Sequence, residues 1–175
     1  MRDRKREKIG TAQELVLLIE SNQERFYKVA YSYVKNREDA LDIVHDAIVK
    51  ALQSYHTLRK PEYAQTWFYR ILINESISFG RKKKKEVLLD DLTVSQLSSD
   101  GAFSEPCRED YLDLYTAIDR LPAELKTVVI LRFFEDMKLD TIARITSTNL
   151  STTKSRLYRA LKYLKLEIEV LEHGG

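Results

Sequence analysis

The chain has 175 residues, enough for one ordinary domain or two small ones. Hydrophobic residues make up 43% of it and charged residues 32%, which allows a packed core and excludes a chain disordered along its whole length. The formal net charge is only +2, so any affinity for nucleic acid must come from local clusters of charge. The presence of only five glycines and three prolines favours helices over turn-rich sheet.

The single cysteine and the distribution of apolar residues indicate the compartment. Cys107 is the only cysteine, which excludes an intramolecular disulfide and a cysteine-rich metal site and fits a reducing environment. Residues 1–8 are heavily charged, and no apolar core of signal-peptide length follows them. The longest apolar runs, such as residues 128–131, are too short to cross a bilayer. We therefore expect a cytoplasmic protein.

The first half of the chain has the patterning of four helices. Thr11 and Glu14 form a capping box in front of the first helix, and Asn36 is placed to cap the third. Residues 55–61 are expected to form a loop, and Pro61 suits the first turn of the fourth helix. Apolar residues recur in each helix at the spacing of one buried face. These residues are Leu15, Leu18 and Ile19; Phe26, Val29, Ala30, Tyr33 and Val34; Ala40, Ile43, Val44, Ala47, Ile48, Ala51 and Leu52; and Trp67, Phe68, Ile71, Leu72 and Ile77.

A polar segment separates this block from a second one. The basic run at residues 81–85 ends the fourth helix, and residues 90–106 are rich in Asp, Ser and Thr with little helical period. Helical signals return at Glu109, and Leu121-Pro122 breaks them once. The helices expected there are residues 109–121, 122–134, 139–146 and 150–171.

No segment has the clear two-residue period that is typical of a strand, so we predict an all-α fold. The prediction is two small helical domains, residues 10–85 and 109–172, joined by a polar linker at residues 86–108. Because such a linker is flexible, the two domains are expected to move relative to each other.

The last two helices have the pattern of a helix-turn-helix. Residues 142–145 belong to a short helix, a tight break follows, and Asn149 is placed to cap a second helix whose first amides can face a phosphate. Arginine and lysine can donate to guanine edges or phosphates, so that helix is a candidate for a DNA major groove. A helical hairpin with a solvated basic face is the alternative. The apolar face carries Thr153, Leu157, Leu161 and Leu164, and the polar face carries Lys154, Ser155, Tyr158, Arg159 and Lys162.

The fourth helix offers further candidates for contact with nucleic acid. Trp67 and Tyr69 lie next to Arg70, and aromatic rings beside cations can stack on unpaired bases, although the spacing also suits a helix core. Asn74 can both donate and accept hydrogen bonds, as base recognition requires. The basic run at residues 81–85 is either a solvated surface or a site for phosphates.

The third helix has an acidic face. Asp39, Asp42 and Asp46 lie at i, i+3 and i+7, on one side of the helix. Carboxylates along one exposed helix rarely converge on a metal ion, so we expect no metal site and no cofactor. A surface offered to a basic region of a partner protein is the better interpretation.

No set of residues for catalysis is apparent. His45, His56 and His173 lie apart in the sequence, and neither a G-x-S-x-G nor a P-loop motif occurs. We therefore expect that the chain is not an enzyme.

Together these segments resemble the extracytoplasmic-function (ECF) sigma factors, the minimal sigma-70-type initiation factors of bacteria. Residues 39–47 are similar to the D-A-x-D-x-x-Q-[ED]-x segment, which docks on the polymerase clamp. Residues 66–74 are similar to the T-W-L-Y-R-I-x-x-N stretch at the minus-10 element. Residues 152–160 are similar to the T-V-K-S-R-L-x-R-A segment, which reads the minus-35 element. The resemblance covers about residues 22–85 and 109–165.

The resemblance implies a factor that binds core RNA polymerase and promoter DNA, directs promoter-specific initiation and aids melting of the duplex. It also implies an anti-sigma factor, anchored in the membrane, that holds a monomeric free chain inactive. The implied contacts with core polymerase are Asp39, Asp42, His45 and Asp46. The implied minus-10 contacts are Tyr55, Trp67, Arg70, Asn74, Arg81, Lys82 and Lys83. The implied minus-35 contacts are Thr152, Lys154, Ser155, Arg156, Tyr158 and Arg159.

The chain departs from the family's pattern at several positions. His45 stands where glutamine is usual, which implies a clamp contact that is altered or sensitive to pH. Ser147 stands where the turn usually has glycine, so we expect a positive φ with some strain. Thr153 replaces an apolar core residue, which is expected to loosen the last helix slightly. The loop at residues 55–63 is long, which affects the base contacts expected there.

A stand-alone helix-turn-helix regulator is the alternative function. Such a protein binds duplex DNA tightly by itself, usually as a dimer on a palindrome. The aromatic stretch at residues 67–74 and the acidic face of the third helix favour the sigma-factor interpretation. A helical hydrolase is disfavoured because no acid-base set is assembled.

Overall fold

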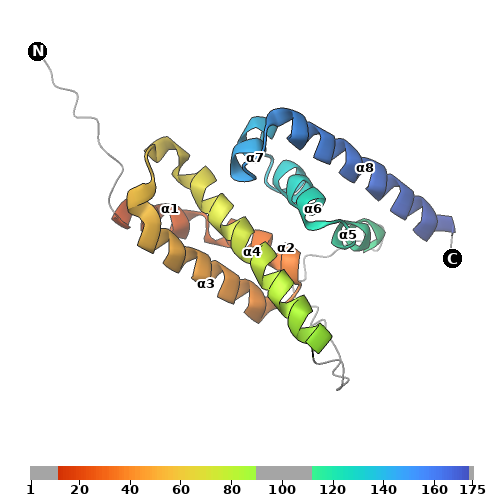
Figure 1. Cartoon of the computed structure of the whole chain (residues 1–175), viewed down its shortest axis with the longest axis horizontal. Coiled ribbons are helices and arrows are strands. Elements are labelled where there is room, and N and C mark those ends of the chain that lie inside the picture. The colour runs from red at the N-terminus through yellow and green to blue at the C-terminus, as the bar shows by residue number, and fades with distance from the viewer. Residues whose placement is uncertain (1–11, 90–111, 174–175) are drawn as a thin grey trace, which may run out of the picture.

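The computed structural model describes residues 12–89 and 112–173, and both ranges are mainly helical (Figure 1). No described residue lies in a strand, so the all-α prediction is confirmed. Thr11, Cys107 and the predicted linker at residues 90–106 lie outside the described residues. The N-terminal half, residues 12–89, contains α1 (Ala12–Ser21), α2 (Gln23–Val34), α3 (Arg37–Ser54), the 3-10 turns η1 (Tyr55–Thr57) and η2 (Pro61–Tyr63), and α4 (Ala64–Leu89). The C-terminal half, residues 112–173, contains α5 (Leu112–Asp119), α6 (Ala123–Val129), the π-helical turn η4 (Ile130–Phe134), α7 (Leu139–Ile145) and α8 (Leu150–His173).

Local signals set the helix starts as predicted. Asn36 caps α3, because its side-chain oxygen accepts a hydrogen bond of 2.9 Å from the amide of Asp39. Asn149 caps α8 in the same way, with 2.7 Å to the amide of Thr152. Pro61 opens the turn η2, which leads directly into α4. The side-chain caps predicted at Asn36 and Asn149 are therefore confirmed.

The helix α4 is longer than predicted, since it continues through the basic run to Leu89. Lysine and arginine are good helix formers, and the one glycine in the helix, Gly80, costs only about 1 kcal/mol relative to alanine. That cost does not end a helix whose earlier turns are anchored by buried Leu72 and Ile73. Although α4 has 26 residues, neither it nor another helix in the described ranges has the apolar length that a bilayer requires.

The N-terminal half packs α2, α3 and α4 around an aromatic centre. Phe26, Phe68 and Tyr69 are completely buried. The ring centroids of Phe26 and Phe68 lie 4.5 Å apart, and those of Phe26 and Tyr69 lie 5.1 Å apart, edge to face. Such pairs contribute about 0.5–1.5 kcal/mol beyond the area that they bury. Phe68 therefore belongs to the core, whereas Trp67 lies half-buried at its margin.

A smaller core lies within the C-terminal half, between α5, α6 and α8. Leu121-Pro122 separates α5 from α6, as predicted. The expected helix at residues 122–134 is α6 followed by the π-helical turn η4. Ala160 takes the buried position in α8, so Leu161, expected on the apolar face, is 41% exposed.

The helices α7 and α8 form the predicted helix-turn-helix. The amide of Thr148 donates a 2.9 Å hydrogen bond to the carbonyl of Ala143, which closes the end of α7. Ser147, in the turn, has a φ of 55°, so the expected positive φ is confirmed. For a residue with a Cβ atom, this conformation is uncommon and carries some strain.

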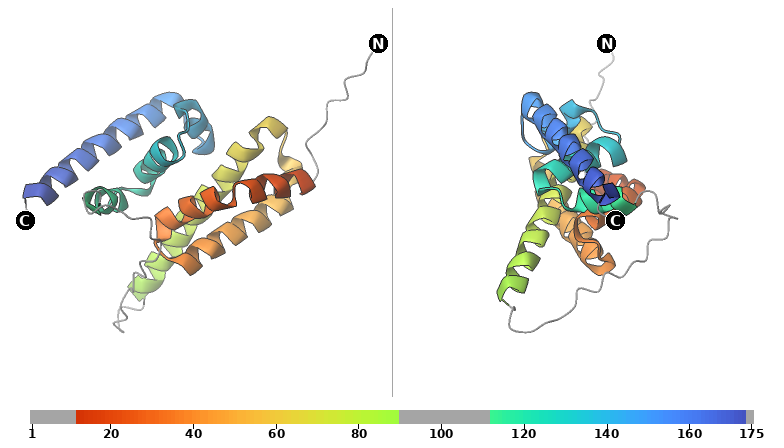
Figure 2. Two further views of the ribbon diagram at one scale, coloured as in Figure 1. Left: turned by 180° about the vertical axis from the view of Figure 1, so that it is seen from behind. Right: turned by 90° about the vertical axis from the view of Figure 1, so that its right-hand side faces the viewer.

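The two halves pack against each other. Figure 1 shows α7 beside the first part of α4, and the left view of Figure 2 shows the C-terminal helices along one side of the N-terminal bundle. The expectation of freely moving domains is therefore wrong for this structure. Residues of both halves form one buried cluster, which joins Val128, Ile130, Leu131, Ile142 and Ile145 to Phe26, Val29, Phe68, Tyr69 and Leu72.

Candidate nucleic-acid and partner surfaces

The exposed face of α8 carries four of the predicted minus-35 residues. Lys154, Ser155, Tyr158 and Arg159 are all exposed, and Tyr158 is 73% accessible. They lie at i, i+1, i+4 and i+5, so they share one side of the helix. This side has the donors that a major-groove surface requires.

Thr153 lies on the opposite side of α8 and is completely buried. Its hydroxyl lies 3.0 Å from the carbonyl oxygen of Asn149, to which it can donate, and 3.0 Å from the hydroxyl of Thr148. A buried hydroxyl with such partners carries little desolvation penalty. Local hydrogen bonds therefore allow the Thr153 hydroxyl to lie in the core. These bonds were not expected from the sequence, where threonine stands in place of an apolar core residue.

Arg156 and Thr152 are placed differently from the other predicted minus-35 residues. The Arg156 guanidinium forms a 2.9 Å ion pair with Glu124 of α6, and its side chain is only 19% exposed. Thr152 is half-buried, and its amide is held by the cap residue Asn149. Arg156 therefore ties α8 to α6 within the C-terminal half.

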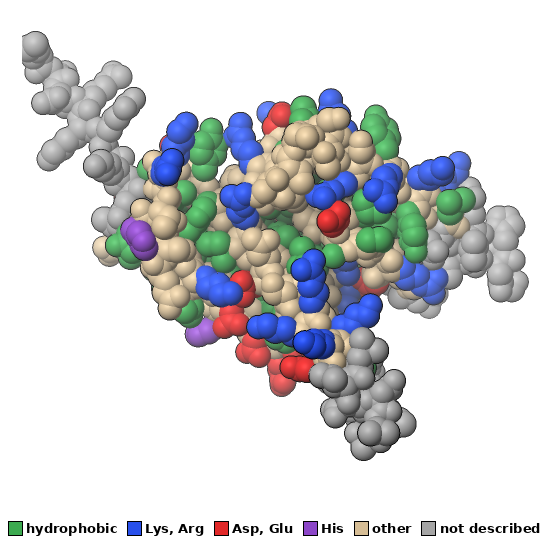
Figure 3. Space-filling model, viewed as in Figure 1, with side chains coloured by type: hydrophobic (Ala, Val, Ile, Leu, Met, Phe, Trp, Pro, Cys, Tyr) green, Lys and Arg blue, Asp and Glu red, His purple; other side chains and the backbone are tan. Residues whose placement is uncertain are grey.

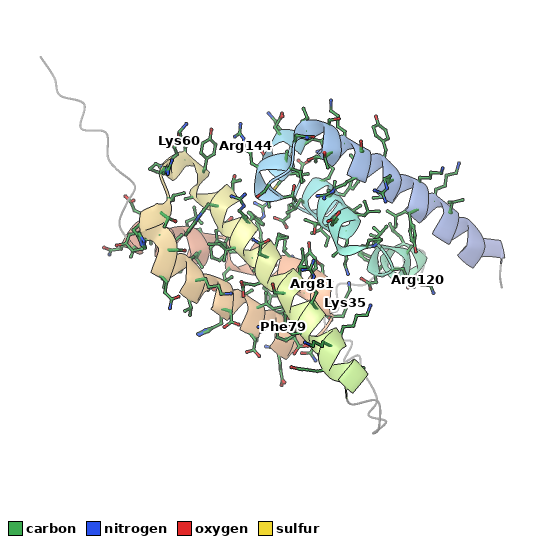
Figure 4. The ribbon with its side chains drawn as sticks, in the orientation of Figure 1. Lys35, Lys60, Phe79, Arg81, Arg120 and Arg144 are labelled. Carbon is green, nitrogen blue, oxygen red and sulfur yellow. The ribbon has the colours of Figure 1, made fainter. Side chains whose placement is uncertain are left out.

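An open pocket of about 350 Å³ lies at the start of α4. Its walls come from the loop at residues 57–60, from Tyr63, Trp67 and Arg70, and from Arg144 of α7. The walls are therefore aromatic and basic. Figure 4 shows Lys60 and Arg144 close to each other at this end of α4.

The other predicted minus-10 residues lie further along α4, except Tyr55, which precedes the pocket loop. Asn74 is exposed one turn beyond Arg70, and Arg81 and Lys82 are exposed on later turns. Lys83 is half-buried, because it forms an ion pair with Asp39 of α3. Tyr55 lies in η1, half-buried against the core.

The acidic residues predicted to share one face of α3 are exposed, except Asp39. Asp42, His45 and Asp46 are exposed, whereas the Asp39 side chain is 19% exposed and is paired with Lys83. The prediction that all three aspartates share an exposed side is wrong for Asp39. Figure 3 shows acidic side chains gathered along the lower edge of the view, where α3 runs. Within the described residues, no group of His, Cys, Asp or Glu is arranged to hold a metal ion.

A buried acidic residue joins the two halves, and sequence reasoning missed it. Glu135 follows η4 and has a side chain that is only 5% exposed. Its carboxylate accepts hydrogen bonds from the Tyr69 hydroxyl at 2.5 Å and from the Arg25 Nε atom at 3.1 Å. A second Arg25 nitrogen donates to the Glu135 carbonyl oxygen at 3.4 Å. Burial raises the pKa of Tyr69, and the neighbouring Glu135 raises it further.

A second polar contact crosses the same boundary. The hydroxyls of Tyr33 and Thr127 lie 2.6 Å apart, and burial raises the pKa of Tyr33. The ammonium of Lys126 lies 5.8 Å from the Tyr33 ring and forms a 3.0 Å ion pair with Asp119. Burial lowers the pKa of Lys126, and Asp119 opposes that shift. Asp119 also binds Lys35 of the N-terminal half at 3.3 Å.

Comparison with known proteins identifies the family of each half of the chain. The family model of Sigma-70 region 2 matches residues 18–86, and that of Sigma-70 region 4 matches residues 111–164. RNA polymerase sigma factor SigV of Bacillus subtilis (strain 168) is 48% identical over 157 residues, which span 88% of this chain and 90% of the relative. ECF RNA polymerase sigma factor SigW of the same organism is 27% identical over 179 residues, which span 95% of each chain.

Solved structures of sigma factors share the fold. The sigma factor RpoE from Bartonella quintana, in complex with the anti-sigma factor NepR, matches with a TM-score of 0.68 and 25% identity, over 90% of this chain and 96% of that chain. CnrH, in complex with the cytosolic domain of CnrY, matches with a TM-score of 0.66 and 16% identity, over 92% of this chain and 91% of that chain, which shows the fold alone. The matches to regions 2 and 4 cover the α4 and α8 surfaces described above, so the chain belongs to the extracytoplasmic-function sigma factors of the sigma-70 family, which bind core RNA polymerase and direct it to promoters.

Proposed function

We propose that this sigma factor reads its promoter through two separate surfaces. The start of α4 and the loop before it bind the minus-10 element, and the exposed face of α8 binds the minus-35 element. The pocket at α4 carries this proposal: Tyr63 and Trp67 line it beside Arg70, with Asn74 one turn further on. Rings and cations in this arrangement suit an unpaired base and its phosphates.

The α4 pocket aids melting by holding a base that has left the duplex. Unstacking a base costs a few kcal/mol, and stacking on an aromatic ring returns about 1–3 kcal/mol per base. Tyr63 and Trp67 supply the rings, and Arg70 supplies charge for the adjoining phosphate. The exposed side chains of Arg81 and Lys82 continue this charge along α4.

The α8 face fixes the upstream register on duplex DNA. Lys154 and Arg159 can donate to guanine edges or phosphates, and Ser155 can serve either contact. The N-terminal end of α8 adds amides that can face a phosphate, next to the cap residue Asn149.

Core polymerase binds the acidic face of α3 through Asp42, His45 and Asp46. These side chains are exposed and lie at i, i+3 and i+4 on one helix. A positive surface on the polymerase gains affinity and a faster association from them. Asp39 contributes by fixing α3 to α4 through Lys83.

Regulation follows the pattern of a structural neighbour. RpoE is solved with an anti-sigma factor bound. We propose that a membrane-anchored anti-sigma factor likewise holds this chain inactive in the cytoplasm, where the free chain is a monomer. The chain performs no chemistry of its own, because nucleotide addition belongs to the polymerase.

Transcription with purified components tests the proposal. The chain is added to sigma-free core polymerase, and transcript starts are mapped on genomic DNA. We expect starts at a defined set of promoters, reduced by Asn74→Ala and by Arg159→Ala. Lys138→Ala is the control, because it removes an exposed cation outside both surfaces. Starts that do not depend on the added chain, or that neither variant reduces, contradict the proposal.

A further inference from the structure

A second pocket, of about 360 Å³, lies beside the later turns of α4 and shares no lining residue with the candidate base pocket at the start of that helix. One of its walls is formed by four residues of α4, which lie at i, i+3, i+4 and i+7 on one side of the helix: Ile77, Gly80, Arg81 and Lys84. The other walls come from α2, α5 and α6. Pockets for small molecules occupy about 300–1,000 Å³, so this one is large enough for a compact ligand.

Positive charge exceeds negative charge around this pocket. Arg81 and Lys84 line it and are exposed, and neither forms an ion pair with another described residue. The Lys126 ammonium lies 3.0 Å from the Asp119 carboxylate, which also binds Lys35 at 3.3 Å. One carboxylate therefore serves two ammonium groups, and two further cations beside it have no acidic partner among the described residues. Figure 3 shows lysine and arginine side chains gathered along the later turns of α4.

The buried cation of the pocket is Lys126, whose side chain is only 8% exposed. Burial lowers the pKa of Lys126, and the Asp119 carboxylate opposes that shift without cancelling it. A buried charge that its partner compensates only in part is stabilised by a second group of opposite charge. An anion in the pocket would therefore gain affinity from Lys126 as well as from the exposed cations of α4.

Gly80 leaves the α4 wall of the pocket open. It lies inside the helix, where glycine is less favourable than alanine. Its φ is not positive, so the backbone conformation does not require glycine. A Cβ atom at this position would meet no neighbouring side chain within 4 Å, so packing does not require glycine either. An absent side chain does allow a ligand to approach the helix backbone closely.

From this pocket we infer a second function for the sigma factor: it binds a small molecule that carries a chain of two or three phosphoryl groups. Arg81, Lys84 and Lys126 donate to the phosphate oxygens, and the chain passes over Gly80. Cations on two different helices suit several linked phosphoryl groups better than a single one. The backbone of a DNA duplex is a poorer fit, because it cannot enter a pocket to reach a donor as buried as Lys126.

Calorimetric titration of the full chain tests the site directly. The probes are inorganic triphosphate and adenosine triphosphate, used without divalent cations and at constant ionic strength. We expect saturable binding of one probe molecule per chain. A nucleotide that binds more tightly than triphosphate would show that an organic group contacts the apolar walls at Ile77 and Leu121, whereas equal affinities would assign the site to the phosphate chain alone. Both results support the inference.

Two matched pairs of variants test the residues of the pocket. Lys84→Ala removes a cation that lines the pocket and should weaken triphosphate binding at least about tenfold, as expected for a lost charge-assisted contact. Lys85→Ala removes the same charge from the next exposed residue, which does not line the pocket, and should leave the affinity unchanged. Gly80→Leu adds a side chain at the open wall and should abolish binding, whereas Gly80→Ala adds one methyl group and should retain it.

Unfolding in urea with and without triphosphate gives a second readout, because a ligand that binds only the folded chain raises its stability. Wild type should be stabilised and Gly80→Leu should not, although leucine and alanine both favour the helix and keep the variants folded. Absence of saturable binding, equal losses in Lys84→Ala and Lys85→Ala, or unchanged binding by Gly80→Leu each overturns the inference. It is also overturned if triphosphate does not bind while Lys84→Ala weakens binding to single-stranded DNA, because the cations would then serve nucleic acid.

Discussion

The hydroxyl of Tyr69 in α4 donates a hydrogen bond of 2.5 Å to the Oε2 atom of Glu135, which follows η4 in the other half of the chain. Both residues are buried, and Arg25 supplies the positive charge that balances the carboxylate. The contact thus links the helix that carries the candidate base pocket to the half that carries the helix-turn-helix.

Tyr69→Phe should destabilise the packed chain. The substitution removes only the hydroxyl, so the aromatic core with Phe26 is kept, while the buried Glu135 carboxylate loses one donor. We expect the free energy of unfolding in urea to fall by about 1–3 kcal/mol. Tyr158→Phe removes the same group from a ring that is 73% exposed and should change it by less than about 0.5 kcal/mol. Equal effects of the two variants would show that Glu135 does not depend on Tyr69.

Alkaline pH should weaken the packing of the halves through Tyr33 and Tyr69. Burial raises the pKa of both phenols above the ordinary value of 10.0, so the packed state binds more protons than the unfolded state above that pH. Their stabilising contribution is complete below pH 10.0 and is lost as the pH rises through the higher folded values. The lowered pKa of Lys126 acts in the opposite direction, since stability gains as the pH rises through its window below 10.5.

A double variant separates the contribution of the two tyrosines from the opposing contribution of Lys126. Tyr33→Phe with Tyr69→Phe retains Lys126, so the Lys126 contribution cancels when the variant is compared with wild type. The free energy of unfolding is measured for both proteins at about pH 8 and about pH 11, on either side of the ordinary tyrosine pKa. The loss of stability between these pH values should be larger for wild type. The same loss in both proteins would mean that neither phenol is linked to folding.

The arginines Arg159 and Arg156 should have separable roles, although they lie three residues apart on α8. Arg159 is exposed, so Arg159→Ala should cost about 1–3 kcal/mol of promoter binding by the holoenzyme and leave unfolding unchanged. Arg156 pairs with Glu124, so Arg156→Ala should lower the stability by about 1 kcal/mol or less. Promoter affinity and urea unfolding are measured for both. A larger loss of promoter affinity for Arg156→Ala at unchanged stability would reverse the assignment.

Charge reversal on α3 should weaken binding to core polymerase. Asp42→Lys with Asp46→Lys changes two exposed side chains that the fold does not use in an ion pair between described residues. We expect at least about a tenfold loss of affinity, about 1.4 kcal/mol, with slower association. Glu20→Lys with Glu62→Lys reverses two exposed acids outside α3 and should have a smaller effect. Unaltered affinity of a folded α3 variant would place the interface elsewhere.

Most helices and their starts could be predicted because their signals are local. Asn36 and Asn149 each cap a helix through an amide three residues away. The packing of the two halves could not be predicted in this way, since Arg25 and Glu135 are 110 residues apart. Glu135 also lies between the exposed residues Phe134 and Asp136, where the sequence gives no sign of burial.

The residues of the candidate site likewise divide into those that a local pattern predicts and those whose positions depend on long-range packing. The helical spacing of polar residues in the sequence predicts one exposed face on α8, made of Lys154, Ser155, Tyr158 and Arg159. The pairing of Lys83 with Asp39 brings together two residues predicted for different partners, because α3 and α4 lie side by side. The position of Arg144 over Tyr63 depends on the packing of α7 against α4, which no local pattern specifies.

Opening of promoter DNA, with and without core polymerase, distinguishes a sigma factor with a base-holding α4 pocket from a chain that binds DNA by itself. Duplex promoter DNA is titrated with the chain, with and without core polymerase, in a gel-shift assay, and unpaired thymines are then probed with permanganate. We predict weak binding with little sequence preference by the chain alone, because its net charge is only +2 and the halves that carry its two reading surfaces are packed together. With polymerase, binding should become tight and selective, the minus-10 region should react, and Asn74→Ala should reduce reactivity more than initial binding. Tight, selective binding by the chain alone, with no effect of polymerase and no reactive thymines, would contradict the proposed function.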